Sequence, residues 1–238
     1  MNVDILAIGA HPDDVELACS GTLLQHRAAG YTFGLLDLTR GELGTRGSAD
    51  IRDQEAAASA KLMGAAFRQN LDLGDGSFQN DHNTRLKIIE VLRYCTPTLV
   101  LANALSDRHP DHGRAAKLIH DACFFSGLRR IETQRDGETQ SAFRPKQLIH
   151  YVQDFHRTPD FVVDVSEHME QKIECIKCFA SQFHDPKSTD PQTPLSGEDF
   201  FPFLYSRARE FGRPAGYRYA EGFEHSRLFG VDDLLKLN

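Results

Sequence analysis

The sequence predicts an α/β fold built on a mostly parallel sheet. Short apolar segments of strand length alternate with longer segments whose apolar residues recur at helical spacing, which is typical of βαβ units. The segment 3–10 is apolar almost throughout, as expected of a strand buried on both faces of a parallel sheet. Hydrophobic residues make up 40% of the 238 residues, so the chain can bury a core without disulfide bonds.

The elements follow one another in a regular order through the first half of the chain. Strands are predicted at 3–10, 31–38, 67–73 and 98–103, and helices at 15–30, 49–64, 83–95 and 113–125. The second half is less regular, with strands predicted at 148–152, 161–165 and 217–223 and helices at 167–183 and 200–211. Residues 185–197 are rich in Pro, Ser, Thr and Asp, which favours an exposed loop that could act as a lid.

We therefore expect one domain over residues 1–238. It comprises a Rossmann-like three-layer α/β/α core at 1–130 and a less regular C-terminal region at 131–238 that walls the pocket.

The composition excludes some classes of partner and compartment. The net charge of −7 argues against nucleic acid and membrane surfaces, because both favour basic patches. The five cysteines are odd in number and irregularly spaced, which argues against a secreted disulfide framework. The N-terminus has no basic segment ahead of an apolar one, and no apolar run is long enough to span a membrane. We expect a cytoplasmic protein.

Two segments place ionisable side chains where a parallel sheet positions its ligands. His11–Asp14 directly follows one predicted strand, and Arg108–His112 follows another at short range. Each segment contains the sequence His-Pro-Asp. Ligands of open α/β sheets bind beyond the carboxyl ends of the strands, so adjacent strands would bring the two segments face to face.

The residue types in these segments suit a catalytic metal ion. Such a zinc ion takes about three protein ligands, and His11, Asp14 and His112 can supply them. Asp13 and Asp111 remain, and a spare carboxylate beside a metal ion is a natural general base. A carboxylate beside a spare histidine would fix its tautomer and favour its protonated form. That histidine, His109, would then stabilise an oxyanion or protonate a leaving amine.

A structural alternative exists for each segment alone. Asp13 or Asp14 could cap the following helix, Asp111 could cap the next one, and His109 and His112 could be ordinary loop residues. For a single segment that alternative is favoured. Two such segments, each after a buried strand, favour a functional site instead.

The same segments resemble a known family. The sequences AHPDD at 10–14, TRGELGTRG at 39–47 and RHPDH at 108–112 resemble the PIG-L/LmbE-like family of zinc N-deacetylases. TPLSGEDF at 193–200, REFGRP at 209–214 and YAEGF at 219–223 are similar to its bacillithiol-biosynthesis branch, which deacetylates N-acetylglucosaminyl-malate.

The resemblance implies a role for each residue of the two segments. It makes His11, Asp14 and His112 the zinc ligands and Asp13 the base that activates water. It makes His109, held by Asp111, the residue that stabilises the tetrahedral oxyanion. Fe²⁺ or Co²⁺ could occupy the same ligands as Zn²⁺.

Three further residues are candidates for substrate binding. The resemblance implies that Arg52 and Arg108 hold substrate, and a guanidinium suits the carboxylates of a malate group. The alternative for Arg52 is an exposed ion pair with Glu55, three positions further on the same predicted helix. Glu42 could bind sugar hydroxyls or brace its glycine-rich loop, and the sequence leaves both open.

Some relatives carry a tyrosine in the late loop that reaches the active site. The corresponding stretch here, 198–201, has no hydroxyl group. Either another residue such as Tyr205 serves instead, or His109 alone stabilises the oxyanion.

The expected function is zinc-dependent hydrolysis of N-acetylglucosaminyl-malate to glucosaminyl-malate and acetate in bacillithiol biosynthesis. One alternative is deacetylation of another N-acetylglucosamine derivative, such as a chitooligosaccharide or a mycothiol-type precursor. An alternative of another class is a non-catalytic metal-containing sugar-binding protein. The expected partner is thus a small acetylated amino sugar. Family members form hexamers or smaller assemblies, so the sequence leaves a homo-oligomer open.

Overall fold

A seven-stranded sheet runs through the computed structural model, which describes residues 1–183 and 189–236. In chain order its strands are β1 (Ile5–Gly9), β2 (Phe33–Asp37), β3 (Arg68–Asn70), β4 (Leu99–Ala102), β7 (Gln147–Tyr151), β8 (Phe161–Asp164) and β9 (Ala220–Glu224). Their order in space is β3-β2-β1-β4-β7-β9-β8. The first five pair in parallel, and β9 is antiparallel to both of its neighbours. The predicted α/β fold with a mostly parallel sheet is confirmed.

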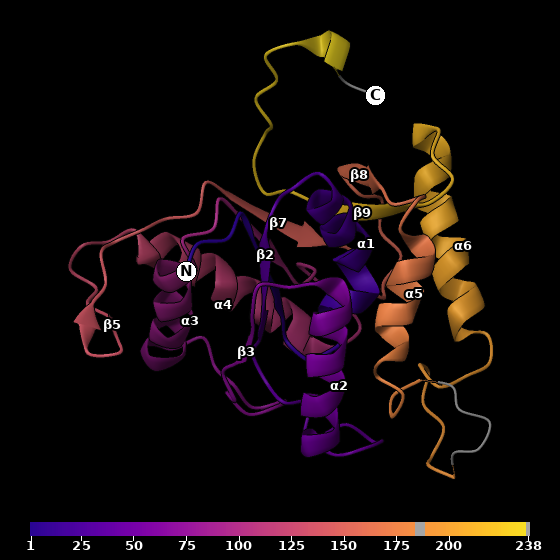
Figure 1. Cartoon of the computed structure of the whole chain (residues 1–238), viewed down its shortest axis with the longest axis horizontal. Coiled ribbons are helices and arrows are strands. Elements are labelled where there is room, and N and C mark those ends of the chain that lie inside the picture. The colour runs from indigo at the N-terminus through magenta and orange to yellow at the C-terminus, as the bar shows by residue number, and fades with distance from the viewer. Residues whose placement is uncertain (184–188, 237–238) are drawn as a thin grey trace.

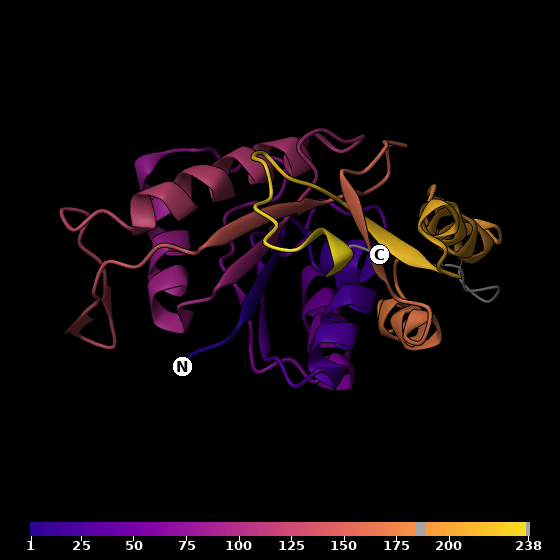
Figure 2. The ribbon, with the colours of Figure 1, turned by 90° about the horizontal axis from the view of Figure 1, so that it is seen from above.

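Helices cover both faces of this sheet (Figures 1 and 2). They are α1 (Asp14–Ala28), α2 (Ala49–Met63), α3 (His82–Cys95), α4 (Pro110–Ser126), α5 (Met169–Lys177) and α6 (Phe200–Gly212). Along β1, Leu6 and Ile8 face the core that holds α3 and α4, whereas Ile5 and Ala7 face the core that holds α1 and α2. Successive side chains of a strand point to opposite faces, so one apolar strand serves both layers.

The second half of the chain builds a smaller apolar cluster beside this core. Residues of α5, such as Ile173 and Ile176, pack there with Phe179, Phe183 and the first turns of α6. The rings of Phe183 and Phe200 stack with their centroids 5.4 Å apart. Helix α6 also lies along β9 at this side of the sheet (Figure 1). This cluster positions the residues that face the candidate site from the C-terminal region.

Helix α4 begins three residues earlier than the sequence predicts. The prediction started it at residue 113, but Pro110 occupies the first turn, where proline is tolerated because it needs no amide partner. His109 is consequently the N-cap, and His112 belongs to the first turn of the helix. The early start fixes both side chains at the carboxyl end of β4.

Two other predictions in the second half differ from the structure. Helix α5 ends at Lys177 rather than at residue 183. A hairpin of β5 (Gln134–Arg135) and β6 (Glu138–Thr139) was not predicted. Its turn is Asp136-Gly137, with φ of 52° and 82°, and Asp-Gly favours such a turn.

Part of the predicted lid at 185–197 lies outside the described residues, which resume at 189. The described part, 189–197, is non-helical and precedes α6. Among residues 1–183 and 189–236, no helix is both long and apolar enough to cross a membrane.

Candidate active site

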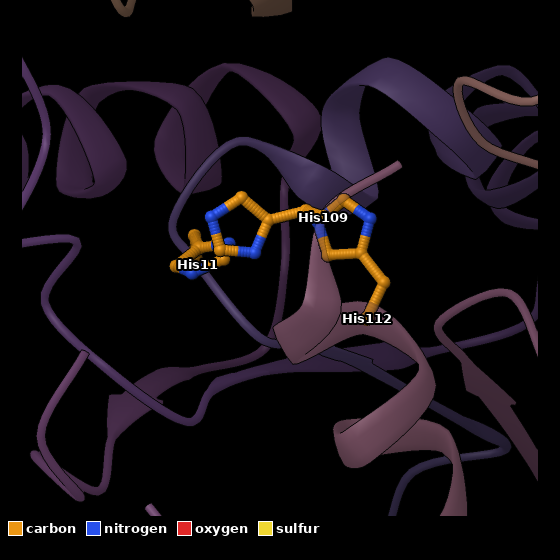
Figure 3. A group of neighbouring side chains, drawn as sticks. All are labelled: His11, His109 and His112. Atoms are coloured by element: carbon orange, nitrogen blue, oxygen red, sulfur yellow. The ribbon is translucent and has the colours of Figure 1, made fainter. Parts of the chain in front are cut away.

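The candidate site lies where the order of the parallel strands reverses. β1 pairs with β2 on one side and with β4 on the other, in the register Ala7↔Leu101. Neighbouring parallel strands whose connections leave in opposite directions open a crevice at their carboxyl ends. The two predicted segments follow these two strands, so they meet there as expected. Figure 3 shows the resulting cluster of three histidine side chains, whose ring centroids are 4.6–5.6 Å apart.

Asp14 lies between two of these histidines. Its Oδ1 is 3.1 Å from His112 Nε2, and its Oδ2 is 3.6 Å from His11 Nδ1. Amide groups fix the carboxylate from behind: Oδ2 accepts hydrogen bonds from the backbone of His11 and from Asn103 Nδ2, each at 3.0 Å. Oδ1 accepts another from Gln153 Nε2 at 3.1 Å. The three predicted metal ligands are thus brought together.

The far nitrogen of each imidazole contacts a carboxylate. His11 Nε2 lies 3.0 Å from Asp75 Oδ1, and His112 Nδ1 lies 2.6 Å from Asp107 Oδ2. Histidines that bind a metal usually hold their other nitrogen against a carboxylate in this way, which sets tautomer and basicity. The nitrogens nearest to Asp14 are left for a metal ion.

The residues fit a divalent cation by charge as well as by donor type. Two nitrogens and a carboxylate oxygen form a common zinc ligand set. Around them the site holds more carboxylates than guanidiniums: Asp13, Asp14, Asp75, Asp107 and Asp111 against Arg52 and Arg114. A divalent ion would offset this surplus of negative charge.

Among the described residues, two sets of three side chains each have all three donor atoms within 4.8 Å of one another, and neither set includes Asp14. One is His11, His109 and His112, and the other is His11, Asp75 and Asp111. We favour the set with Asp14, because Asp75 already contacts the far nitrogen of His11 and His109 Nδ1 already accepts from the backbone N–H of Asp111.

Protons hold this cluster together without a metal. Burial opposes a charge on His112, but Asp14 and Asp107 outweigh it and raise the pKa of His112 to about 9. Burial likewise opposes ionisation of Asp14, yet the charge of His112 and the hydrogen bonds of both histidines hold its pKa well below the usual range. A metal ion would have to displace a proton from His112.

Asp13 has an unusual backbone and a buried side chain. Its φ of 116° lies where non-glycine residues are strained, at a cost of about 1–3 kcal/mol, a feature that concentrates at functional sites. Burial raises the pKa of Asp13 to about 7, although the charge of Arg52, whose Nη2 is 3.2 Å from Asp13 Oδ2, opposes this. A carboxylate that titrates near neutral pH is well suited to general base catalysis.

His109 is held differently from the expectation that Asp111 would keep it protonated. The backbone N–H of Asp111 donates to His109 Nδ1 at 3.2 Å, so Nδ1 is an acceptor and the ring proton lies on Nε2. Burial and the charges of His11 and His112 lower the pKa of His109. Both observations favour the neutral ring.

The Asp111 carboxylate turns to other partners. It lies 3.5 Å from His11 Nε2, accepts from the backbone N–H of Gly76 at 2.9 Å, and pairs with Arg114 Nη1 at 2.5 Å. The hydrogen bond between Asp111 and His109 comes from the backbone N–H of Asp111, not from its carboxylate.

Arg52 does not make the exposed ion pair offered as its alternative. Its side chain is buried at the cavity, where Nη2 contacts Asp13 and donates to Gln182 Oε1 at 2.5 Å. Glu55 instead accepts hydrogen bonds from the backbone and hydroxyl of Ser181. Gly41, with φ of 66°, makes room for Arg52, because a Cβ there would lie 2.1 Å from Arg52 Nη1.

Arg108 and Glu42 contribute differently to the site. Arg108 lines the cavity from a partly exposed position and pairs with Asp154 at 2.6 Å. Glu42 accepts from the backbone N–H groups of Asp75 and Arg40, at 2.7 and 3.2 Å. These contacts brace the glycine-rich loop, and Glu42 is not among the residues that line the cavity.

Four supporting residues were missed by the sequence reasoning: Asp75, Asp107, Asn103 and Gln153. The sequence holds a signal for two of them: Asp75 stands between two glycines, and Asp107 immediately precedes the second segment. Tyr205 does not reach the site: its hydroxyl donates to Glu170 at 2.8 Å.

A cavity of about 430 Å³ opens over the cluster. This is within the range of small-molecule sites. Its far wall comes from the C-terminal region and includes Thr193, Pro194, Leu195, Phe203, Leu204 and Arg207. The described end of the predicted lid thus lines the cavity.

Known proteins resemble this chain over most of its length. Residues 6–123 match the family model described as PIG-L: GlcNAc-PI de-N-acetylase. A diacetylchitobiose deacetylase of Thermococcus kodakarensis is 28% identical over 92% of this chain and 81% of its own. A 4-oxalmesaconate hydratase of Pseudomonas putida is 27% identical over 75% of this chain and 74% of its own.

A solved structure extends the similarity to the whole fold. A conserved protein of Thermus thermophilus superposes with a TM-score of 0.84 and is 32% identical, covering 97% of this chain and 98% of that one.

Proposed function

The chain belongs to the PIG-L family of de-N-acetylases, and we propose that it hydrolyses the N-acetyl group of an amino sugar. One observation carries this proposal. The buried carboxylate of Asp13, with a pKa of about 7, lies beside a cluster of histidines and aspartates that suits a metal ion. A structural metal site has no need of a base beside it, whereas amide hydrolysis does.

His11, Asp14 and His112 would hold the ion, which we propose to be Zn²⁺, with Fe²⁺ or Co²⁺ able to use the same ligands. When bound, the ion supplies a Lewis acid that polarises the acetyl carbonyl and acidifies water. Asp75 and Asp107 orient the two imidazoles, and Asp111 supports His11.

The protons move through this chain's own groups. Asp13 removes a proton from the attacking water, and the water oxygen bonds to the acetyl carbon. His109 donates a hydrogen bond from its Nε2–H to the developing oxyanion and keeps that proton, as its neutral tautomer allows. The protonated Asp13 then gives its proton to the amine nitrogen as the C–N bond breaks. The products are acetate and the free amine.

The proposed substrate is N-acetylglucosaminyl-malate, as used in bacillithiol biosynthesis in the cytoplasm. The resemblance of segments 193–200, 209–214 and 219–223 to that branch supports it, and the first of these segments reaches the cavity wall. Arg52 and Arg108 also line this cavity and are proposed to contact substrate. The diacetylchitobiose deacetylase relative favours a chitooligosaccharide as the alternative sugar.

A hydratase is the second candidate, because one relative of similar identity is a 4-oxalmesaconate hydratase. A base and a metal ion could equally activate water for addition to a carbon–carbon double bond. Such a reaction releases no acetate, so the two candidates are readily separated.

The test is acetate release by zinc-replete protein from N-acetylglucosaminyl-malate, N,N'-diacetylchitobiose and N-acetylglucosamine, with 4-oxalmesaconate as a hydration substrate. We expect acetate release, fastest from the malate glycoside. Faster release from the chitobiose would replace the proposed sugar. Turnover of 4-oxalmesaconate without any acetate release would overturn the deacetylase proposal.

A further inference from the structure

Three arginines line the cavity, and they differ in how their charge is compensated. Arg52 contacts Asp13 at 3.2 Å, and Arg108 contacts Asp154 at 2.6 Å. Arg207, on α6, has no carboxylate within 4.0 Å among residues 1–183 and 189–236. Of the three, it alone has no carboxylate partner in the described part of the chain.

The surroundings of Arg207 make this lack of a partner costly. Burial lowers the pKa of Arg207, which means that its charge is poorly solvated. Among the described residues, the acidic groups whose charges act on Arg207 already have other partners: Asp154 pairs with Arg108, Glu221 with Lys172 at 2.5 Å, and Asp107 with His112. Arg207 is half-buried, and a partly desolvated guanidinium that faces a ligand cavity favours an anionic ligand.

Arg207 is nevertheless held in place beside the histidine cluster. Its Nη1 donates to the backbone carbonyl of Gln153, whose side chain donates to Asp14. Its guanidinium lies 5.3 Å from the ring centroid of Phe203. In the described part of the chain, the backbone carbonyl is the one protein acceptor of this guanidinium. A guanidinium has five N–H donors, so most of them are available to a ligand.

We propose that Arg207 binds a carboxylate carried by the substrate and thereby selects acidic aglycones over neutral sugars. The inference rests on the proposed deacetylase function, which places the acetylated amine at the histidine cluster. A planar guanidinium can bind a carboxylate through two parallel hydrogen bonds. Leu17 and Leu204 also line the cavity, and apolar neighbours strengthen such a pair by limiting the access of water.

The assignment distinguishes Arg207 from the arginines that the sequence resemblance indicates. Arg52 contacts Asp13 and Arg108 contacts Asp154, so each of them would share its guanidinium between the substrate and a carboxylate of the protein. Sequence reasoning could not single out Arg207, because what identifies it is its place at the cavity without a carboxylate partner among the described residues.

Binding of L-malate to zinc-replete protein tests the inference independently of turnover. Calorimetry would compare wild type with Arg207→Met, Arg207→Lys and the control Arg209→Met, with uncharged malamide as the matched ligand. Arg209 lies on the same helix with an exposed side chain. We expect Arg207→Met to weaken L-malate binding about 10- to 100-fold, the usual range for a charge-assisted contact. The affinity of Arg207→Lys for L-malate should lie between those of wild type and Arg207→Met, and the affinity of Arg209→Met should match wild type.

The kinetic arm asks whether the effect is specific to charge. We expect Arg207→Met to lower kcat/KM for N-acetylglucosaminyl-malate by a similar factor, mainly by raising KM. The kcat/KM for N,N'-diacetylchitobiose should change less than about threefold. A merely structural role would lower both alike. Equal losses, or malate affinity independent of Arg207, overturn the inference. Arginine-dependent malate binding without acetate release from any sugar would refute the deacetylase function and leave the anion site standing.

Discussion

Two buried clusters of charged residues each include a residue from the first turn of α1, and they differ in how their charges are held. In the first, Arg68 bonds both oxygens of Asp37, at 2.7 and 2.8 Å, and reaches Glu16 at 2.6 Å. Ser59 adds a hydrogen bond to Glu16, and the ring of Phe179 lies 5.7 Å from the guanidinium. This cluster is closed by packing and lies outside the cavity.

The second cluster, around His11, Asp14 and His112, is open to the cavity and has a surplus of carboxylates. Its groups are fixed by neighbouring amides and carboxylates rather than by one shared guanidinium. The difference indicates what each cluster does. The closed one holds β2, β3 and α1 together, and the open one is arranged for a cation and for proton transfer.

Replacement of Asp13 in the open cluster should have the largest effect. Asp13→Asn keeps a residue that tolerates positive φ, so the backbone can stay in place. Without the base, kcat for deacetylation should fall about 10²- to 10⁴-fold, while zinc content stays at the wild-type value. Acetate release and metal analysis on the same sample measure both.

Stability should change in the opposite sense to activity. The pKa of Asp13 is raised to about 7 in the fold, so its ionisation destabilises the metal-free protein as pH rises from the unfolded value through 7. Asp13→Asn should therefore raise the Tm of the metal-free protein at pH 8, and raise it less at pH 5, where only part of this destabilisation has developed. A fall in Tm at both pH values would show that this carboxylate is structural.

Replacement of Arg68 in the closed cluster should reverse that pattern. Arg68→Met leaves Asp37 and Glu16 buried without a cation, which costs about 3–5 kcal/mol. For a chain of this size Tm should fall by roughly 10 °C or more. Adding Glu16→Gln and Asp37→Asn to the same chain should recover most of the loss. Greatly reduced activity per folded molecule, with Tm unchanged, would contradict the assignment of the closed cluster to stability.

Asp107 tests how the open cluster is supported. Asp107→Asn removes the charge beside His112 Nδ1 but keeps an acceptor for the backbone N–H of Phe155. Zinc affinity should fall about 10- to 100-fold, measured by competition with a chelator. Asp121→Asn, which alters an ion pair with Lys117 at the surface, is the matched control and should leave affinity unchanged.

The smallest expected effect is on how steeply zinc affinity depends on pH. The pKa of His112 is about 9 without metal, so zinc must release its proton between pH 6 and 8. Release of that proton alone should raise zinc affinity about tenfold per pH unit up to about pH 9, and the raised pKa of His11 adds to the slope. The slope should be shallower in Asp107→Asn, because one group that raises the pKa of His112 is gone. Affinity independent of pH would exclude His112 as a ligand.

The sequence predicts the open cluster better than the closed one. Apolar strands followed by His-Pro-Asp predict β1, β4 and the meeting of His11 with His112, since both segments are local and the sheet rule joins them. Asp75 and Gln153 contact the site from positions 64 and 139 residues away from their partners, which no local pattern reveals. The antiparallel β9, the early start of α4 and the Arg68 cluster likewise depend on packing between distant segments.

The central claim, that the open cluster is a metal-dependent hydrolytic site, is tested most directly by a metal titration. Chelator-treated protein would be titrated with Zn²⁺ while acetate release from N-acetylglucosaminyl-malate is followed. The account predicts little activity without metal and a linear recovery that reaches its plateau at one ion per chain, which His112→Ala abolishes. Full acetate release from metal-free protein, or recovery that survives the loss of His112, would contradict it.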